Sequence, residues 1–307
     1  MKKCMLLAMC IVALAGTACQ QKSDIQIVLI TMDSMDEHWL KLNKGAQDKA
    51  KELGNVTVDF KAPQVGKVDA SAQLQIIEDA ITQKVDILML APLHADALVP
   101  GIAKAKEAGI KVILVDSGAN TEDYDAFLFT DNAAAARLAA DELASVIGGQ
   151  GKVAIINAQA GAGTTMTREN EFKAQMASAY PGITIIGTQY SDGDATRALN
   201  IATDFMTANP DLAGIYACNE GSTTGAGNGI EQAGKGGAVR LVGFDWTANT
   251  KSLIERGILD ATMVQNPYEM GYQGVQAGVD LLQGKTVQRQ IDTGVTVATS
   301  ANAESIK

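Results

Sequence analysis

The sequence contains few of the residues on which many disulfide-rich and metal-dependent proteins rely. It has four cysteines, two histidines and six prolines in 307 residues, and 5% of its residues are aromatic. Two histidines exclude a histidine-rich metal site and an H-E-x-x-H zinc helix, and four cysteines are too few for a disulfide scaffold. No G-x-S-x-G nucleophile motif is present. A basic surplus is also missing, since the net charge of −10 argues against a nucleic-acid partner.

The remaining composition is that of an ordinary globular protein. Apolar residues make up 47% of the chain and charged residues 20%, with 30 glycines. These fractions exclude collagen-like, low-complexity and disordered chains. At about 150 residues for each domain, the length predicts two domains, and the acidic charge is consistent with a soluble protein.

The start of the chain has the pattern of an export signal. Lysines at 2 and 3 precede a mostly apolar stretch, 5–15, which is too short for a stable bilayer-spanning helix. Small residues at 16–18 then lead to Cys19. This order resembles a bacterial lipoprotein signal, in which the cysteine becomes the lipidated N-terminus after cleavage. Gly16 departs from that pattern, which prefers leucine at this place, and ordinary cleavage near Ala18 with Cys19 unmodified is the alternative.

Either form of cleavage produces an exported protein. We predict a signal peptide at 1–18 and a lipidated tether at 19–24, which would hold the protein on the outer face of the cell membrane or in the periplasm. Removing two of the 25 basic residues leaves 23 against 35 acidic ones, a side-chain charge near −12. Cys218 would then be the free thiol, and its apolar neighbours predict a buried structural cysteine rather than a nucleophile.

Short apolar runs alternate with amphipathic segments from residue 25 onward. The runs lack polar alternation, as expected of parallel strands that helices cover on both faces. In the first half they are 25–32, 56–60, 87–91, 112–115 and 127–129. Between them, apolar residues recur at steps of three and four, and Gly54 and Gly109 end two of these helical patterns. The repeated strand–helix units predict a doubly wound sheet.

The same alternation restarts after a group of glycines at 148–151. Strands are expected at 153–157, 183–190, 214–218, 239–244 and 260–264, with helices such as 168–179 and 198–208 between them. The chain therefore contains two α/β halves of similar size. No long proline-rich or serine-rich linker divides them, and several short crossings between the halves would hide the boundary in this way.

Two glycine-containing segments resemble nucleotide-binding motifs but lack their spacing. The segment 284–286 reads Gly-Lys-Thr, but Val279 stands where a phosphate loop needs a glycine, and a helical pattern precedes it. Gly225, Gly227 and Gly229 follow a predicted strand with the spacing G-x-G-x-G instead of G-x-G-x-x-G. We interpret these three glycines as a site of close helix packing.

Polar residues gather just past the carboxyl ends of the predicted strands, where ligands bind in open α/β sheets. They are the segment 33–39, Asp116 with Ser117, Asp131 with Asn132, Thr164, Thr165 and Arg168, Asn219 with Glu220, Asp245 with Trp246, and Gln265 with Asn266. Carboxylates and amides recur at equivalent places in the two halves. This set suits a neutral polyol, because each hydroxyl both donates and accepts hydrogen bonds.

Several short motifs, in a fixed order, carry a family resemblance over nearly the whole chain after the signal. They are Lys44-Gly45-Ala46, Val115-Asp116, Thr130-Asp131-Asn132, Gly161 to Arg168 followed by Glu169, Asn219-Glu220, Val242-Gly243-Phe244-Asp245, and Ala261-Thr262 leading to Gln265. The chain resembles the exported sugar-binding proteins related to ribose-binding protein and galactose/glucose-binding protein, which have the type I periplasmic binding fold. The resemblance implies two doubly wound α/β lobes joined by three hinge crossings, with a sugar held between them.

The resemblance also implies lobe boundaries and residue roles. The N-terminal lobe would comprise 25–130 and 266–294, and the C-terminal lobe 131–265 and 295–307. The side chains expected to bond to sugar hydroxyls are Asp36, Asp116, Arg168, Asn219, Asp245 and Gln265. His38 or Trp39 would lie against a face of the sugar ring.

Some of these side chains have an alternative role in the fold. Trp39 fits the apolar stripe of its helix and could pack in the core, whereas His38 could lie on the surface or in a loop. Arg168 could pair with Glu169 or Glu171 on the surface.

Helix and turn capping is the alternative for the strand-end residues. Asp116, Asn219 and Asp245 could each cap a following turn, because Asp and Asn favour such places. Asp131 and Asn132 are expected to serve the hinge or a helix cap rather than the sugar.

Three departures limit what the resemblance implies. Ser117 stands where ribose-binding proteins carry an arginine that reaches the sugar, and this shorter side chain leaves room. The loop 191–194 lacks the aromatic residue that relatives place there and offers at most Tyr190. No galactose-type calcium loop is evident in the second half, so we predict neither a metal nor a cofactor. These departures leave space for a polyol larger than a pentose or of another shape.

We predict a lipoprotein that captures a monosaccharide or similar polyol and delivers it to the permease of an ABC transporter and its ATPase. It would act as a monomer, without enzymatic activity and without a nucleic-acid partner. The alternative is a sugar-sensing protein that presents its ligand to a chemoreceptor or sensor kinase. The glycine spacing and the export signal disfavour a dehydrogenase, and a repressor of the lactose-repressor type would need a basic helix-turn-helix at the start.

Overall fold

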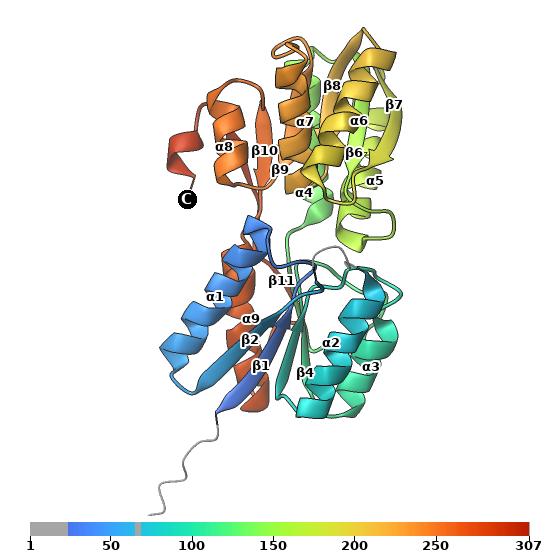
Figure 1. Cartoon of the computed structure of the whole chain (residues 1–307). Coiled ribbons are helices and arrows are strands. Elements are labelled where there is room, and N and C mark those ends of the chain that lie inside the picture. Colours follow the sequence, from blue (N-terminus) through green and yellow to red (C-terminus); the bar gives the residue numbers. More distant parts are fainter. Residues whose placement is uncertain (1–23, 65–68, 307) are drawn as a thin grey trace, which may run out of the picture.

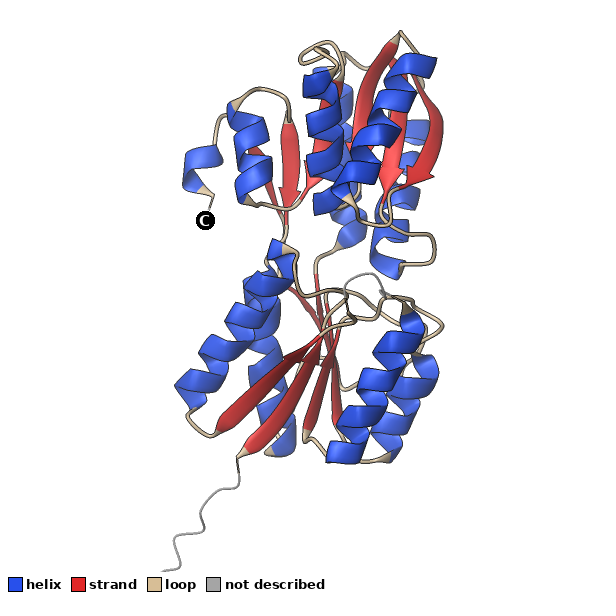
Figure 2. Ribbon diagram, viewed as in Figure 1, coloured by secondary structure: helices blue, strands red, loops and turns tan. Residues whose placement is uncertain are grey.

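The chain forms two α/β lobes, which lie one above the other in Figure 1. This computed structural model describes residues 24–64 and 69–306. Each lobe has a 6-stranded sheet, and most neighbouring strands run parallel (Figure 2). The predicted fold class, two doubly wound α/β halves, is confirmed.

The first lobe combines the N-terminal half of the chain with one late helix and one late strand. Its sheet has the strand order β11-β5-β4-β3-β1-β2, and all its neighbours pair in parallel. The strands are β1 (Ile25–Ile30), β2 (Val56–Lys61), β3 (Ile87–Leu90), β4 (Lys111–Val115), β5 (Ala126–Phe129) and β11 (Gln290–Asp292). The helices are α1 (Glu37–Leu53), α2 (Ala70–Gln83), α3 (Val99–Glu107) and α9 (Pro267–Leu282).

The second lobe repeats this arrangement with the strand order β12-β10-β9-β8-β6-β7. Its strands are β6 (Gly151–Asn157), β7 (Ile183–Tyr190), β8 (Leu212–Ala217), β9 (Arg240–Phe244), β10 (Ala261–Val264) and β12 (Thr296–Thr299). Its helices are α4 (Asn132–Val146), α5 (Gly163–Ala179), α6 (Ala195–Ala208), α7 (Glu220–Gln232) and α8 (Ala248–Glu255), followed near the end by a 3-10 helix (Ala303–Ser305). Only β12 runs antiparallel to its neighbour among the described strands of this sheet.

The chain passes between the lobes three times. The crossings are 130–131, between β5 and α4; 265–266, between β10 and α9; and 293–295, between β11 and β12. Each crossing is short, so the two sheets are joined by a narrow waist, which is visible at the middle of Figure 1.

Apolar side chains from each sheet fill a core on both of its faces. In the first lobe, α1 and α9 cover one face, and α2 and α3 cover the other. In the second lobe, α4 and α5 cover one face, and α6, α7 and α8 cover the other. Because successive side chains of a strand point to opposite faces, a strand with helices on both sides must be apolar throughout. This burial explains the absence of polar alternation in the strand sequences.

Glycines allow two pairs of helices to approach closely. A Cβ atom at Gly45 of α1 would lie 2.0 Å from the backbone oxygen of Tyr268 in α9, and one at Gly271 would lie 1.9 Å from a backbone oxygen of α1. Between α6 and α7, a Cβ atom at Gly225 would lie 2.2 Å from the backbone oxygen of Ala195. The interpretation of the glycines at 225–229 as a packing site is confirmed.

Two strands were not predicted, and the predicted export signal lies outside the described residues. The sequence does not predict β11 and β12, because each has only three or four residues and no continuous apolar run. The predicted signal peptide, 1–18, and Cys19 lie outside the described residues. Within 24–64 and 69–306, no helix is both long and apolar enough to cross a bilayer.

Candidate functional site

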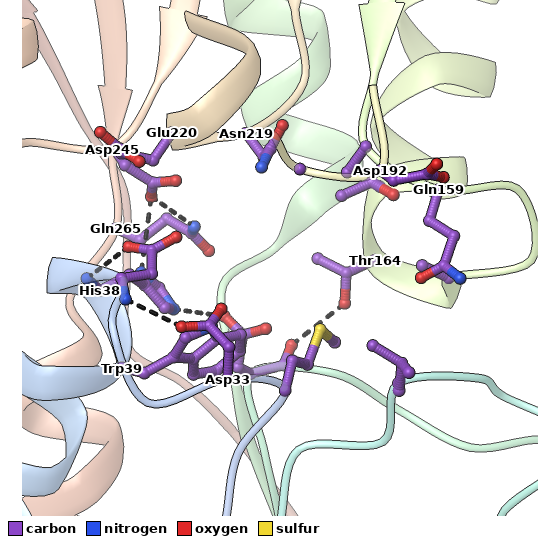
Figure 3. A pocket seen from close by; sticks show the side chains of 18 of the residues that line it. Asp33, His38, Trp39, Gln159, Thr164, Asp192, Asn219, Glu220, Asp245 and Gln265 are labelled. Atoms are coloured by element: carbon purple, nitrogen blue, oxygen red, sulfur yellow. Dashed lines mark hydrogen bonds and ion pairs between the residues drawn. The ribbon is translucent and has the colours of Figure 1, made fainter. Parts of the chain in front are cut away.

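The carboxyl ends of strands from both sheets surround one cavity between the lobes (Figure 3). Its volume is about 190 Å³. Every side chain that the sequence predicts to bind a ligand lines this cavity: Asp36, His38, Trp39, Asp116, Arg168, Asn219, Asp245 and Gln265. Their contact with a ligand stays a prediction, but the fold brings all of them to one place.

The turn before α1 places its first residues beside the cavity. One Asp33 carboxylate oxygen accepts hydrogen bonds from the backbone N–H groups of Met35 and Asp36, each 2.8 Å long. Asp36 then caps α1, because its Oδ1 accepts from the backbone N–H of His38 at 2.8 Å. These bonds fix a tight entry to the helix, from which Asp36, His38 and Trp39 face the cavity.

Asp116 and Asp245 occupy equivalent positions in the two lobes. Each directly follows a central strand, β4 or β9, and has a left-handed backbone with φ of 63° and 75° respectively. Each backbone N–H donates to the neighbouring strand, to the oxygen of Leu128 or of Met263. Neither side chain caps a helix: Thr247 caps the helix that follows Asp245, and the Asp116 carboxylate contacts His38 and Ser117 instead. The capping alternative is therefore wrong for both aspartates, and both side chains turn into the cavity.

His38 connects these two aspartates across the lobes. Its Nε2 lies 2.9 Å from Oδ1 of Asp116 and its Nδ1 lies 3.6 Å from Oδ1 of Asp245. The side chain is buried in the first turn of α1, so the surface alternative is wrong. Burial by itself lowers the pKa of His38, but the charge and hydrogen bond of Asp116 and those of Asp245 outweigh it and raise the pKa to about 10. A histidine that is protonated at neutral pH cannot act as a general base.

The pKa of Asp245, the carboxylate in the second lobe, is shifted in the opposite direction. Burial raises the pKa of Asp245, but the hydrogen bond and charge of His38, followed by the charge of Arg168, bring it down to about 2. Asp245 is therefore ionised at neutral pH, and the His38–Asp245 contact is an ion pair between the lobes.

The raised pKa of His38 predicts how the stability of the empty protein depends on pH. An unfolded histidine titrates near 6.5 and His38 near 10, so the folded state holds the extra proton between these values. The free energy of unfolding should fall as the pH rises through this range, by up to about 1.4 kcal/mol for each pH unit. The variant His38→Gln should lack most of this slope in thermal unfolding measured from pH 6 to pH 10. The variant His94→Gln is the matched control and should keep it; an unchanged slope in His38→Gln would assign the effect to another group.

Arg168 lies in the wall of the cavity rather than on the surface. It is 2% exposed, its Nε donates to Oδ1 of Asn132 at 2.8 Å and its Nη1 donates to the backbone oxygen of Cys218 at 2.8 Å. The guanidinium also stacks on the ring of Phe244, 3.9 Å from its centroid. Its buried Nη2 has no hydrogen-bond partner among the described residues. The alternative of a surface pair with Glu169 or Glu171 is wrong, and one strong donor remains for a ligand.

Amide side chains complete the wall that the second lobe contributes. Asn219 caps α7 through its Oδ1, which accepts from the backbone N–H of Ser222 at 3.3 Å, so the capping alternative is confirmed here. Its Nδ2 is not used by that bond. Gln265 lies in a crossing between the lobes, and its Nε2 donates to Oδ1 of Asp245 at 2.7 Å. Its buried Oε1 has no partner among the described residues.

Trp39 serves the core and the cavity at once. The side chain is 6% exposed and packs in the apolar cluster beneath α1 and α9, as the core alternative predicts. It also lines the cavity, and the His38 ring meets it edge to face with centroids 4.7 Å apart. Trp39 can therefore offer part of its apolar face to a ligand without leaving the core.

Two further carboxylates line the cavity from opposite lobes and influence each other's charge. Asp36 comes from the first lobe and Glu220 from the start of α7 in the second. Burial raises the pKa of Asp36 to about 7, with the negative charges of Glu220 and Asp245 adding to the effect against the opposing influence of His38. Burial, followed by the charge of Asp245, also raises the pKa of Glu220.

The structure adds lining residues that were not predicted to bind. They are Met32, Asp33, Leu93, Ala158, Gln159, Ala162, Thr164, Thr165, Asp192, Gly193 and Glu220. The strand-end rule already names Asp33, Thr164, Thr165 and Glu220, without a bond to the sugar assigned to them, and it applies equally to Gln159 after β6 and Asp192 after β7. In the loop 191–194, Asp192 and Gly193 line the cavity, whereas the hydroxyl of Tyr190 donates to Glu169 outside it.

The other residues singled out in the sequence have structural roles. Asp131 caps α4 through a bond of 2.9 Å from the backbone N–H of Ala134, as predicted. Ser117 donates to Oδ2 of Asp116 at 3.0 Å. Cys218 is buried, which confirms the structural interpretation, and burial raises the pKa of its thiol. Within the described part of the chain, no group of three or more His, Cys, Asp or Glu side chains could hold a metal ion.

Known proteins are similar to this chain in both sequence and architecture. The model of the periplasmic binding protein domain family matches residues 27–286. The chain is 32% identical to the D-allose-binding periplasmic protein of Escherichia coli, over 86% of each chain. It is 30% identical to the ribose import binding protein of Salmonella typhimurium, over 90% of this chain and 92% of the other.

Solved structures show the same similarity. An ABC transporter solute-binding protein from Agrobacterium vitis with bound D-fucose is 37% identical, with a TM-score of 0.88 over 90% of this chain and 96% of the other. A second one from that organism, with bound α-D-tagatopyranose, is 32% identical, with a TM-score of 0.86 over 91% and 96%.

Proposed function

The chain belongs to the periplasmic binding protein family, and from that premise we propose that it captures one monosaccharide or a similar polyol outside the cell membrane and delivers it to an ABC permease. The cavity between the lobes is the observation that carries this proposal. Acceptors and donors on both walls match the mixed hydrogen bonding of hydroxyl groups, and Trp39 supplies an apolar surface for the C–H face of a sugar ring. A volume of about 190 Å³ favours a single small ring, since sites for drug-sized ligands have roughly 300–1,000 Å³.

Ligand binding would stabilise the closed arrangement of the lobes. Asp36, His38, Trp39 and Asp116 belong to one lobe, and Arg168, Asn219 and Asp245 to the other, with Gln265 in a crossing between them. A sugar that touches both walls makes all of its bonds only when the lobes are closed, and this difference in binding shifts the equilibrium towards closure. The bodies that move would be 25–130 with 266–294 and 131–265 with 295–307. The closed, loaded form would then dock on the permease.

The proposal includes attachment to the membrane through Cys19. The order of small residues before this cysteine supports lipidation after removal of 1–18. Mass spectrometry of the protein from a membrane fraction should find a diacylated N-terminal cysteine, and an unmodified N-terminus near residue 19 would contradict the anchor while leaving export in place.

A ligand screen tests the binding function. Purified protein without the signal peptide should melt about 5–10 °C higher in the presence of a pentose, hexose, deoxy sugar or polyol at 100 to 1,000 times its Kd, because a ligand at that level adds about 3–4 kcal/mol to stability. Disaccharides are the matched negative ligands, since the cavity is too small for two rings. Absence of a shift with every monosaccharide and polyol would contradict the proposed function.

A further inference from the structure

The charges in the cavity are unequally distributed. Two cations, His38 and Arg168, lie beside the Asp116 and Asp245 carboxylates, and the distances of 2.9 Å and 3.6 Å from His38 show that one histidine serves both aspartates. These four groups compensate one another. Asp36 and Glu220 take no part in these contacts, and the raised pKa of each carboxyl shows that ionising both together is unfavourable in the empty cavity.

Asp36 and Glu220 have no cationic partner in an ion pair among the described residues. Asp36 uses its Oδ1 to cap α1, and Glu220 uses its Oε1 to accept a bond of 2.9 Å from Thr224. Glu220 also interacts with the hydroxyl of Thr247, whereas Oδ2 of Asp36 accepts no hydrogen bond from another described residue. The two side chains come from opposite lobes, so closing the lobes brings like charges towards each other, which is unfavourable unless something positive lies between them.

A buried amide oxygen adds a further acceptor at the same end of the cavity. Gln265 is 7% exposed, and the bond from its Nε2 to Asp245 leaves its Oε1 without a partner. In Figure 3, Gln265 lies beside Asp245, below Glu220 and above His38. A buried acceptor without a donor costs about 1–3 kcal/mol. The side chains of Asp36, Glu220 and Gln265 therefore present more acceptor oxygens than donors to the cavity.

An ammonium group matches this set better than a hydroxyl does. It has three donors, no lone pair and a positive charge, whereas a hydroxyl has one donor and two acceptor sites. Three donors could satisfy Asp36, Glu220 and Gln265 together, and the charge would remove the repulsion between the two carboxylates.

We propose that the preferred ligand is a sugar or polyol with a protonated amino group, which lies between Asp36 and Glu220. This inference rests on the proposed sugar-binding function and specifies the class of ligand. The remaining hydroxyls of such a ligand would bond to Arg168, Asn219 and the aspartates of the central strands.

Calorimetric titration with matched pairs of ligands tests the inference. The pairs are D-glucose, D-galactose and D-allose against their derivatives with an amino group at carbon 2 or carbon 6, with the N-acetyl derivatives as neutral controls. At neutral pH, at least one amino sugar should bind ten times more tightly than its parent or more. The variant Asp36→Asn with Glu220→Gln should lose that preference, because both replacements keep the shape and the capping or hydroxyl bond but remove the charge. The variant Asp204→Asn, at an exposed position on α6 outside the cavity, should keep it.

The outcomes separate this inference from the function on which it rests. If a parent sugar binds and no amino derivative binds more tightly, the amine is excluded and sugar binding stands. The amine is also excluded if the double variant keeps the full preference. If neither parents nor amino derivatives bind and the wider screen is negative, the sugar-binding function fails and the inference fails with it.

Discussion

Replacing Asp245 by asparagine is expected to weaken ligand binding at least about 100-fold. The Asp245 carboxylate accepts a hydrogen bond from Gln265 at 2.7 Å and faces the protonated His38 at 3.6 Å. An amide in its place has only one acceptor oxygen and would turn an NH₂ group towards one of these donors or towards the sugar. Removing one partner of a buried charge pair costs about 2–5 kcal/mol, and about 3 kcal/mol corresponds to two orders of magnitude in Kd. Calorimetric titration of the best ligand from the screen measures this loss.

The control variants for this prediction are Asp116→Asn, at the equivalent position of the other lobe, and Asp204→Asn, outside the cavity. Asp116→Asn should also weaken binding, because His38 lies 2.9 Å from that carboxylate, whereas Asp204→Asn should bind as the unmodified protein does. Circular dichroism should show that all three variants are folded. Unchanged affinity in a folded Asp245→Asn variant would remove Asp245 from the binding site.

Replacing Arg168 by methionine is expected to weaken binding about 10- to 100-fold and also to lower the melting temperature. Methionine fills much of the same space beside Phe244, but it removes the only guanidinium in the cavity wall among the described lining residues. The loss of Nη2 deprives a ligand hydroxyl of a charged donor, worth about 1.5–3 kcal/mol. The loss of Nε and Nη1 leaves Oδ1 of Asn132 and the backbone oxygen of Cys218 without their donor. These two acceptors belong to the fold, so the empty protein should melt at a lower temperature as well.

The two effects of this substitution can be measured separately. The melting temperature of the empty variant reports the structural loss, and the increase on adding ligand reports binding. Arg168→Lys keeps the charge but lacks the planar set of donors, so it should bind more weakly than the unmodified protein and more tightly than Arg168→Met. A Met variant with an unchanged ligand-induced shift would contradict a role for Arg168 in binding.

The sequence predicts the positions of the site residues well because a simple rule applies to them. In a parallel sheet the carboxyl ends of the strands lie along one edge. Because both sheets direct that edge towards the same cavity, Asp116 after β4 and Asp245 after β9 lie close together. The same rule covers Asp192 and Glu220. The sequence assigns neither of them a bond to the ligand, because the resemblance calls for an aromatic residue in the loop 191–194 and for Asn219 after β8.

Relations between the lobes could not be predicted from the sequence. The contact between His38 and Asp245 joins residues 207 positions apart on different lobes, and no local pattern encodes the distance between two bodies. The pKa of about 10 for His38 follows from that contact and from Asp116, so it too needs the tertiary structure. The strands β11 and β12 present a similar case, since each is defined by its neighbour in the sheet rather than by its own few side chains.

Core packing and ligand contact are alternatives for Trp39 in the sequence, but the structure places the side chain in the core and at the cavity together. The side chain packs under α1 and α9 and also reaches the cavity. A large side chain at the border of a core can have both roles, and the periodicity of a helix cannot separate them.

The three short crossings limit the freedom with which the lobes can move. Two bodies joined by one flexible chain can tilt, twist and slide, whereas three connections of two or three residues leave little besides a rotation about one axis. Gln265 lies in one of these crossings, and Asn132, which accepts a bond from Arg168, directly follows another. A ligand that bonds to Gln265 and Arg168 therefore acts at the rotation axis. Because one angle then describes how far the lobes are closed, a single distance between an atom of each lobe would report it.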